Sequence, residues 1–170
     1  LEFVERQCSR RMACEPTGVL SSFITLLTAL LSDSQEQIEV QQIERQFCFA
    51  LLWTVGGLLD TADRTKFDLH LRTIAEGTTL PPQEGGDTLY EYRINETTFE
   101  WEHWARTVPK WQHRGEDIGA SFTSILVPTI DSVRSQHMLE LSLARGRPVL
   151  FVGSPGTAKT SSVLRVLAKQ

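Results

Sequence analysis

The sequence predicts an α/β protein with an N-terminal all-helical part. Three observations support this class: helical spacing of apolar residues before residue 76, two-residue alternation around residues 89–101, and an apolar tetrad at 149–152 before a glycine-containing loop. The chain has 170 residues, enough for one domain or two small ones. We therefore expect a helical unit at 1–76, a linker at 77–88 and a second unit at 89–170.

The helical unit contains three apolar patterns with spacings of three and four residues. Thr17 or Ser21 is the expected cap of the first helix, and a polar turn at 32–37 follows it. The expected apolar face of the first helix is Leu20, Phe23, Leu27, Leu30 and Leu31. That of the second is Ile43, Phe47, Ala50, Leu51, Trp53 and Leu58. The third, which Gly77 should end, is Phe67, Leu71 and Ile74.

A β-hairpin is expected after the linker. Residues 89–94 and 98–101 alternate large apolar with polar groups around a turn at 95–97. Trp104 and Trp111 extend this aromatic segment, and we interpret them as packing residues because the chain is acidic.

One more helix and a strand are expected before the loop. Thr129 or Asp131 should cap the helix, which continues to about Ala144 and stops at Gly146. Its expected apolar face is Ile130, Val133, Met138, Leu141 and Leu143. The uninterrupted tetrad at 149–152 is typical of a parallel strand covered on both faces.

Residues 153–160, Gly-Ser-Pro-Gly-Thr-Ala-Lys-Thr, match a phosphate-binding loop between a strand and an amphipathic helix with Val163, Leu164 and Leu167. Backbone N–H groups and the helix N-terminus of such a loop wrap a phosphate. Lys159 should neutralise the β and γ oxygens of ATP or ADP, and the Thr160 hydroxyl should bind Mg²⁺. The expected phosphate-binding residues are Gly153, Ser154, Pro155, Gly156, Thr157, Ala158, Lys159 and Thr160.

Ala158 departs from the motif, which has glycine before the lysine. A positive φ at an alanine costs roughly 1–2 kcal/mol, enough to weaken nucleotide binding by about tenfold. The alternative is therefore a non-catalytic interaction module with a degenerate, empty loop, and a third hypothesis is an unrelated P-loop kinase or ATPase. Hydrolysis needs a Walker B carboxylate on a later strand and usually an arginine finger, and only ten residues follow Thr160. We expect no catalytic residue in this chain and no hydrolysis by it alone.

Composition excludes several other functions. The net charge of −4 argues against nucleic-acid binding, and no apolar stretch reaches the roughly 20 residues of a membrane helix. Cys8, Cys14 and Cys48 form no CxxC pair, so we expect thiols and no zinc site. No basic region precedes an apolar core at the N-terminus, so we expect no signal peptide, and because the sequence lacks an initial methionine we expect it to be part of a longer protein.

Several segments resemble dynein heavy chains. Residues 49–57, Phe-Ala-Leu-Leu-Trp-Thr-Val-Gly-Gly, followed by Asp60 and by Arg-Thr-Lys-Phe at 64–67, resemble a segment near the end of the second AAA+ module. Residues 126–134, Leu-Val-Pro-Thr-Ile-Asp-Ser-Val-Arg, are similar to the stretch that opens the third module. Residues 146–153 follow at the family's distance and lead into the loop.

The hairpin region at 90–111, with Trp101-X-X-Trp104 and Val-Pro-Lys-Trp at 108–111, is similar to the segment between the two modules. The Thr-Ala-Lys-Thr ending at 157–160 resembles axonemal more than cytoplasmic dyneins. The resemblance implies that 1–76 is the small helical subdomain of the second module and that the remainder begins the large subdomain of the third. It also implies that Leu126, Val127 and Pro128 pack on the adenine.

The same resemblance implies a ring of six AAA+ modules that walks on microtubules. In this family the third module is a regulatory ATP/ADP site, whose nucleotide state gates the main hydrolysis site in the first. The implied partners are the rest of the heavy-chain ring and, through other parts of the protein, microtubules and dynein intermediate and light chains. The implied location is the cytoplasm and cytoskeleton, in the axoneme of a cilium or flagellum.

Overall fold

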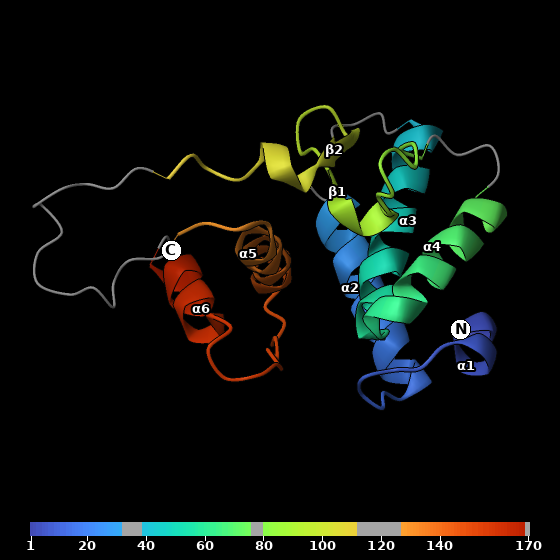
Figure 1. Cartoon of the computed structure of the whole chain (residues 1–170), viewed down its shortest axis with the longest axis horizontal. Helices are drawn as coiled ribbons and strands as arrows, with labels where there is room; N and C mark the ends of the chain where they lie inside the picture. The colour runs from blue at the N-terminus through green and yellow to red at the C-terminus, as the bar shows by residue number, and fades with distance from the viewer. Residues whose placement is uncertain (32–38, 76–79, 112–126, 169–170) are drawn as a thin grey trace, which may run out of the picture. The chain divides into compact units, whose positions relative to one another are not determined.

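A computed structural model describes residues 1–31, 39–75, 80–111 and 127–168. The chain divides into two compact units, Leu1–His103 and Trp104–Gln170. In Figure 1 the first unit contains helices α1 to α4 and the hairpin, and the second contains α5 and α6. The expected linker at 77–88 and the subdomain boundaries stay predictions.

The first unit is helical up to residue 75 in its described parts, as predicted. Its helices are α1 (Glu2–Gln7), α2 (Pro16–Leu31), α3 (Val40–Thr54) and α4 (Thr61–Ile74), with a 3-10 turn, η1 (Gly56–Leu58), after α3. The expected cap of α2 at Thr17 or Ser21 was wrong, because the helix already begins at Pro16. Proline suits a first helical position, since its missing N–H would have no partner there. The turn at 32–37 and the stop at Gly77 lie outside the described residues.

The core of the first unit gathers side chains from all four helices and from the segment before the hairpin. Its buried members are Val4, Val19, Leu52, Val55, Leu59, Phe67, Leu71, Leu89 and Tyr90. The predicted contributions of Phe67 and Leu71 are therefore confirmed, whereas Ile74 is exposed. Gln46 is also buried, and its amide donates to the carbonyl of Leu30 near the end of α2 at 3.0 Å.

The predicted apolar faces of α2 and α3 were partly wrong. Leu20 is 54% exposed, and Ile43 and Phe47 are 40% and 45% exposed. The buried residues are instead Val19, Leu26 and Ala29 in α2, and Gln46, Cys48, Phe49, Ala50 and Leu52 in α3. Helix α3 carries apolar residues around much of its circumference, so the three-and-four spacing alone could not select the side that packs on the rest of the unit.

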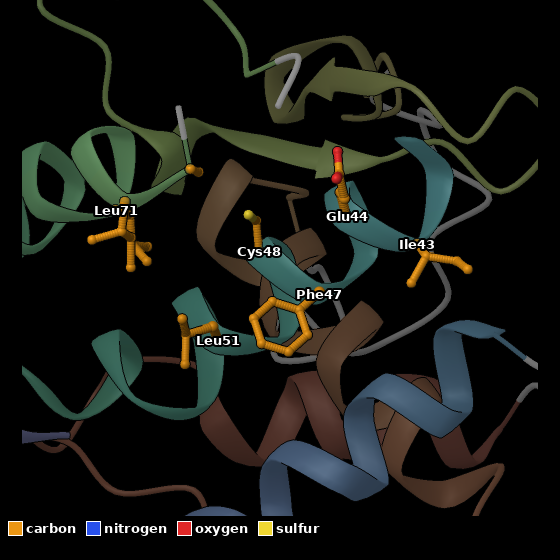
Figure 2. Close-up of a pocket in the computed structure, with 8 residues that line it drawn as sticks. Ile43, Glu44, Phe47, Cys48, Leu51 and Leu71 are labelled. Carbon is orange, nitrogen blue, oxygen red and sulfur yellow. The ribbon is translucent and has the colours of Figure 1, made fainter. Parts of the chain in front are cut away.

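Ile43, Phe47 and Leu51 of α3 were expected in the core. They instead line an open groove, together with the C-terminal end of α4 (Figure 2). The groove has a volume of about 290 Å³. Its lining residues are Ile43, Glu44, Phe47, Cys48, Leu51, Leu71, Ile74 and Ala75. Burial, and to a lesser extent the Glu44 carboxylate, raises the pKa of the Cys48 thiol to about 11. The lining side chains are mainly apolar, and the raised pKa keeps the Cys48 thiol protonated at neutral pH.

The predicted hairpin is confirmed, with shorter strands than expected. Strands β1 (Tyr92–Ile94) and β2 (Trp101–His103) pair antiparallel, with Arg93 opposite Glu102. Residues 89–91 form a 3-10 turn, η2 (Leu89–Glu91), because the Thr88 hydroxyl caps it by accepting from Tyr90 N at 3.4 Å. The turn between the strands is held by the Asn95 side chain, which accepts from the N–H groups of residues 97 and 98.

The second unit contains a 3-10 turn, η3 (Trp104–Arg106), and the helices α5 (Ile130–Leu143) and α6 (Lys159–Leu167). Thr129 caps α5, as predicted, by accepting from Ser132 N at 3.2 Å. Gly146 follows the end of α5 with a φ of 61°, which suits glycine at a helix stop. Trp104 is fully buried and meets the His137 ring edge-on, so its packing role is confirmed.

The predicted apolar faces of α5 and α6 were partly wrong, because several of their members, Val133, Met138, Leu141, Leu143 and Val163, are only half-buried. The buried residues are Ser132, Gln136, His137 and Leu139 in α5, and Ser162 and Val166 in α6. Ile130, Leu164 and Leu167 are exposed, and so is Trp111. The two helices contact each other, and the residues that they bury include the small or polar side chains of Ser132, Gln136 and Ser162. Among the described residues, no helix is long and apolar enough to cross a bilayer.

Candidate nucleotide-binding site

The loop at 153–158 connects an extended segment to α6, which begins at Lys159 as predicted. The expected parallel strand at 149–152 was wrong. Within the described parts of the chain, the sheet consists of β1 and β2 alone, and Leu150 and Val152 are 77% and 73% exposed. An apolar run becomes a strand only beside a neighbour that accepts and donates its backbone hydrogen bonds. The loop therefore follows an extended segment that has no such neighbour among the described residues.

Lys159 closes the loop from its C-terminal end. Its ammonium donates to the carbonyl oxygens of Gly153 at 2.9 Å and Ser154 at 2.7 Å, and to the hydroxyl of Thr157 at 3.0 Å. That hydroxyl in turn donates to the Ser154 carbonyl at 2.9 Å. A lysine ammonium has three donors, so loop atoms take all of them. The side chain thus lies across the loop and does not extend into solvent.

Two residues of the loop have left-handed backbone conformations. Gly156 has a φ of 78°, which glycine adopts without strain. Ala158 has a φ of 53° and a ψ of 23° at the N-cap of α6, and its carbonyl accepts from Ser162 N at 2.9 Å. The positive φ considered for Ala158 from the motif is therefore present, and this conformation costs an alanine roughly 1–2 kcal/mol.

Gly153 leaves the inner side of the loop open. A Cβ built on this residue would lie 3.6 Å from the Thr157 hydroxyl and 3.9 Å from the Lys159 ammonium. A hydrogen at this position therefore keeps the space beside the ammonium accessible. The first N–H groups of α6 lack intrahelical acceptors and the lysine carries a positive charge, which are the features of an anion-binding helix N-terminus.

Thr160 lies in the first turn of α6 and is exposed, so its hydroxyl is accessible to a metal ion that accompanies the phosphates. The described residues contain no group of three or more His, Cys, Asp or Glu side chains that would hold a metal by themselves. The binding of Mg²⁺ by the Thr160 hydroxyl therefore stays a prediction.

The expected adenine-side residues are less well described. Val127 is 48% exposed, and Val127 and Pro128 directly precede the Thr129 cap of α5. Leu126 lies outside the described residues. The structure brings the phosphate-loop residues together, whereas the adenine-side assignment stays a prediction from the resemblance.

The specific contact of Thr157 was missed by sequence reasoning, which placed it only among the residues around the phosphates. Its hydroxyl contacts both Lys159 and Ser154. A hydroxyl residue two positions before the motif lysine was the available signal. A loop sequence does not show whether such a side chain turns toward the lysine or toward solvent.

Comparison with known families agrees with this geometry. Residues 116–170 match the family model of the P-loop containing dynein motor region, and residues 1–106 match that of the dynein heavy chain AAA lid domain. A glycine loop closed by the lysine that opens a helix, together with these matches, defines a P-loop protein of the AAA+ class. The lid model alone covers more than half of the chain. The chain therefore belongs to the dynein heavy chain family.

Comparison with individual relatives indicates which type of dynein heavy chain the sequence represents. The chain is 35% identical to the Dynein gamma chain, flagellar outer arm, of Chlamydomonas reinhardtii over 99% of its own length and 4% of that protein. It is 32% identical to mouse Dynein axonemal heavy chain 5 over 89% of this chain and 3% of that one. It is 37% identical to mouse Dynein axonemal heavy chain 2 over 74% of this chain and 3% of that one.

These matches confirm the resemblance seen in the sequence. The chain is of the axonemal dynein heavy chain type, and the expected location in the axoneme of a cilium or flagellum is confirmed by the relatives. It spans only 3% to 4% of the length of these curated relatives.

Proposed function

We propose that this chain contributes a regulatory ATP- or ADP-binding site to the third AAA+ module of an axonemal dynein heavy chain. The observation that carries the proposal is the loop at 153–158, closed by the Lys159 ammonium at the start of α6. The match of residues 116–170 to a P-loop dynein motor region supports the assignment.

In this proposal each side chain has a distinct task. The loop N–H groups and the N-terminus of α6 hold the phosphates, Lys159 neutralises the β and γ oxygens, and Thr160 provides a ligand to Mg²⁺. Val127 and Pro128, with Leu126, contact the adenine. The bound nucleotide supplies the negative charge that these groups recognise. Residues 1–76 form the small helical subdomain of the second module, and the regulatory role is to gate hydrolysis at the first module.

The wider proposal concerns the whole heavy chain. In this proposal the full heavy chain is an ATP-driven motor that acts on microtubules, and its partners are the rest of the heavy-chain ring and intermediate and light chains bound elsewhere. The positive φ of Ala158 favours the second candidate, in which the loop is degenerate and empty within a non-catalytic interaction module. Direct measurement of nucleotide at this loop separates the two candidates.

The test uses the full-length heavy chain and photolabelling with 8-azido-ATP. Label recovered by mass spectrometry in peptides from residues 127–168 reports this site separately from other P-loops. We expect labelling that ATP and ADP suppress, and its loss in Lys159→Ala, because the lysine provides the charge opposite the phosphates. Lys110→Ala, which removes an exposed lysine outside the loop, is the matched control. Absence of label in the unmodified protein would establish the empty loop instead.

Gating is tested with the same two variants. If the site is regulatory, Lys159→Ala changes the microtubule-stimulated ATPase rate of the heavy chain, whereas Lys110→Ala leaves it unchanged. An unchanged rate, together with lost labelling, would leave a nucleotide site without a regulatory role.

A further inference from the structure

We infer that Thr157 is a positioning residue of the nucleotide site, which acts by holding the Lys159 ammonium in the orientation that receives the phosphates. This inference rests on the proposed function and deepens it. The motif itself requires glycines, a lysine and a final hydroxyl residue, and it specifies no residue at the position of Thr157.

The first step of the argument is the arrangement of three hydrogen bonds. The Thr157 hydroxyl accepts from the Lys159 ammonium at 3.0 Å and donates to the Ser154 carbonyl at 2.9 Å. The ammonium also donates to the same Ser154 carbonyl, at 2.7 Å. Hydroxyl, ammonium and carbonyl therefore form a closed ring of hydrogen bonds. Because the hydroxyl accepts from one partner and donates to the other, two partners fix its orientation.

The second step compares the three acceptors of the ammonium. Two are backbone carbonyls, those of Gly153 and Ser154, and Thr157 is the side-chain acceptor. Phosphate oxygens are anionic and form stronger hydrogen bonds to an ammonium than neutral carbonyls do. Two phosphate oxygens can therefore replace the two carbonyls, while the third donor stays on the hydroxyl. In this exchange the Lys159 ammonium keeps its hydrogen bond to the Thr157 hydroxyl while its other two acceptors change.

The third step is the mobility of a lysine without such a contact. A lysine side chain loses up to about 2 kcal/mol of rotamer entropy when it is held in one conformation. A side chain that is already held before the nucleotide arrives does not pay this cost on binding. Lys159 is only partly buried, so packing alone does not hold it. The Thr157 hydroxyl therefore contributes to nucleotide affinity without touching the nucleotide.

The test compares Thr157→Val with Thr157→Ser in the full-length heavy chain. Valine has nearly the shape of threonine but no hydroxyl, whereas serine keeps the hydroxyl and loses the methyl group. Labelling by 8-azido-ATP at residues 127–168 is competed with unlabelled ATP and, separately, with AMP. We expect Thr157→Val to weaken ATP binding by about tenfold, the loss typical of one hydrogen bond to a charged group. Thr157→Ser should bind ATP like the unmodified protein.

AMP distinguishes positioning of the lysine from general damage to the loop. It lacks the β and γ phosphates that Lys159 contacts, so its affinity should be the same in all three proteins. If Thr157→Val weakens AMP and ATP equally, or if serine fails to restore ATP binding, the hydroxyl has no positioning role. If Thr157→Val binds ATP normally while Lys159→Ala does not, the inference is wrong and the proposed function stands. Failure of the unmodified protein to bind nucleotide would overturn both.

Discussion

The hydroxyl of Tyr90 lies directly against the backbone of Gly56, where a Cβ would overlap it. The same Cβ would approach the Phe67 ring to 2.7 Å. Tyr90 is buried, which raises the pKa of its phenol, and its ring packs edge-on against Trp53. Because Gly56 has no side chain, the segment before the hairpin can pack onto the helices at η1.

Gly56→Ala should destabilise the first unit. Both atoms that the added methyl group meets are fixed in the core, and overpacking of this kind typically costs about 1–3 kcal/mol. Gly57→Ala is the matched control, because its Cβ would meet only Trp53, at an ordinary contact distance of 3.9 Å. Urea unfolding followed by tryptophan fluorescence measures both. Equal midpoints for the two variants would show that the contact between Gly56 and Tyr90 is not tight.

A second prediction concerns the buried carboxylate of Asp68. It accepts hydrogen bonds from Arg72 Nε at 3.1 Å, Gln83 Nε2 at 3.0 Å and Leu89 N at 2.8 Å. Arg72 also donates to the carbonyl of Pro81 at 2.6 Å. Asp68 therefore joins α4 to the segment that leads into the hairpin, and it does so from a fully buried position.

Asp68→Asn should lower the free energy of unfolding by about 3 kcal/mol, because it removes the negative charge opposite a largely buried guanidinium. Asp60→Asn is the control in the same unit. Asp60 pairs with Arg11 at an exposed position, and such a pair contributes at most about 1 kcal/mol. Chemical denaturation of the two variants compares them directly. Similar midpoints would indicate that Asp68 holds the segment no more strongly than a surface ion pair does.

Asp63 should make the first unit sensitive to acid. A hydrogen bond from Lys66, and then one from Ser9 N, lower the pKa of this carboxyl below its ordinary value of 3.8. A lowered pKa in the folded state adds stability that is complete above the pKa of the unfolded chain. That stability is lost as the pH falls through the lower, folded value.

In the unmodified chain, the urea midpoint of unfolding should decrease as the pH is lowered below about 4. Asp63→Asn should be less stable at neutral pH and should show a smaller fall with acid, because the amide does not titrate. Urea midpoints measured from pH 7 to pH 2 test this. Parallel curves for the two proteins would exclude Asp63 as a source of the acid dependence.

Features encoded by neighbouring residues could be predicted from the sequence. The Thr129 cap, the start of α6 at Lys159 and the hairpin around Asn95 all depend on hydrogen bonds within a few residues, and all are present. The family was also recognisable, because several local motifs occur in one order.

Features that depend on distant partners could not be predicted. The spacing of Ile43 and Phe47 placed them on one apolar face of the helix. It could not show that this face lines a groove, because α3 has apolar residues on several sides. The contacts of Asp68 with Gln83 and Leu89 join residues far apart in the chain, and no local pattern marks them. Residues 149–152 have the composition of a strand, but pairing requires a neighbour that composition does not supply.

The last prediction concerns Ala158, whose φ of 53° is one that glycine adopts more easily. Ala158→Gly should relieve roughly 1 kcal/mol of backbone strain in the loop and strengthen ATP binding by up to about tenfold. Gly156→Ala is the opposite change at a φ of 78°, where nothing lies within 4 Å of the added Cβ, so strain alone would weaken binding. Competition of 8-azido-ATP labelling measures both variants. If Ala158→Gly binds ATP no more tightly while Gly156→Ala weakens binding, the surrounding loop already compensates the strain at Ala158.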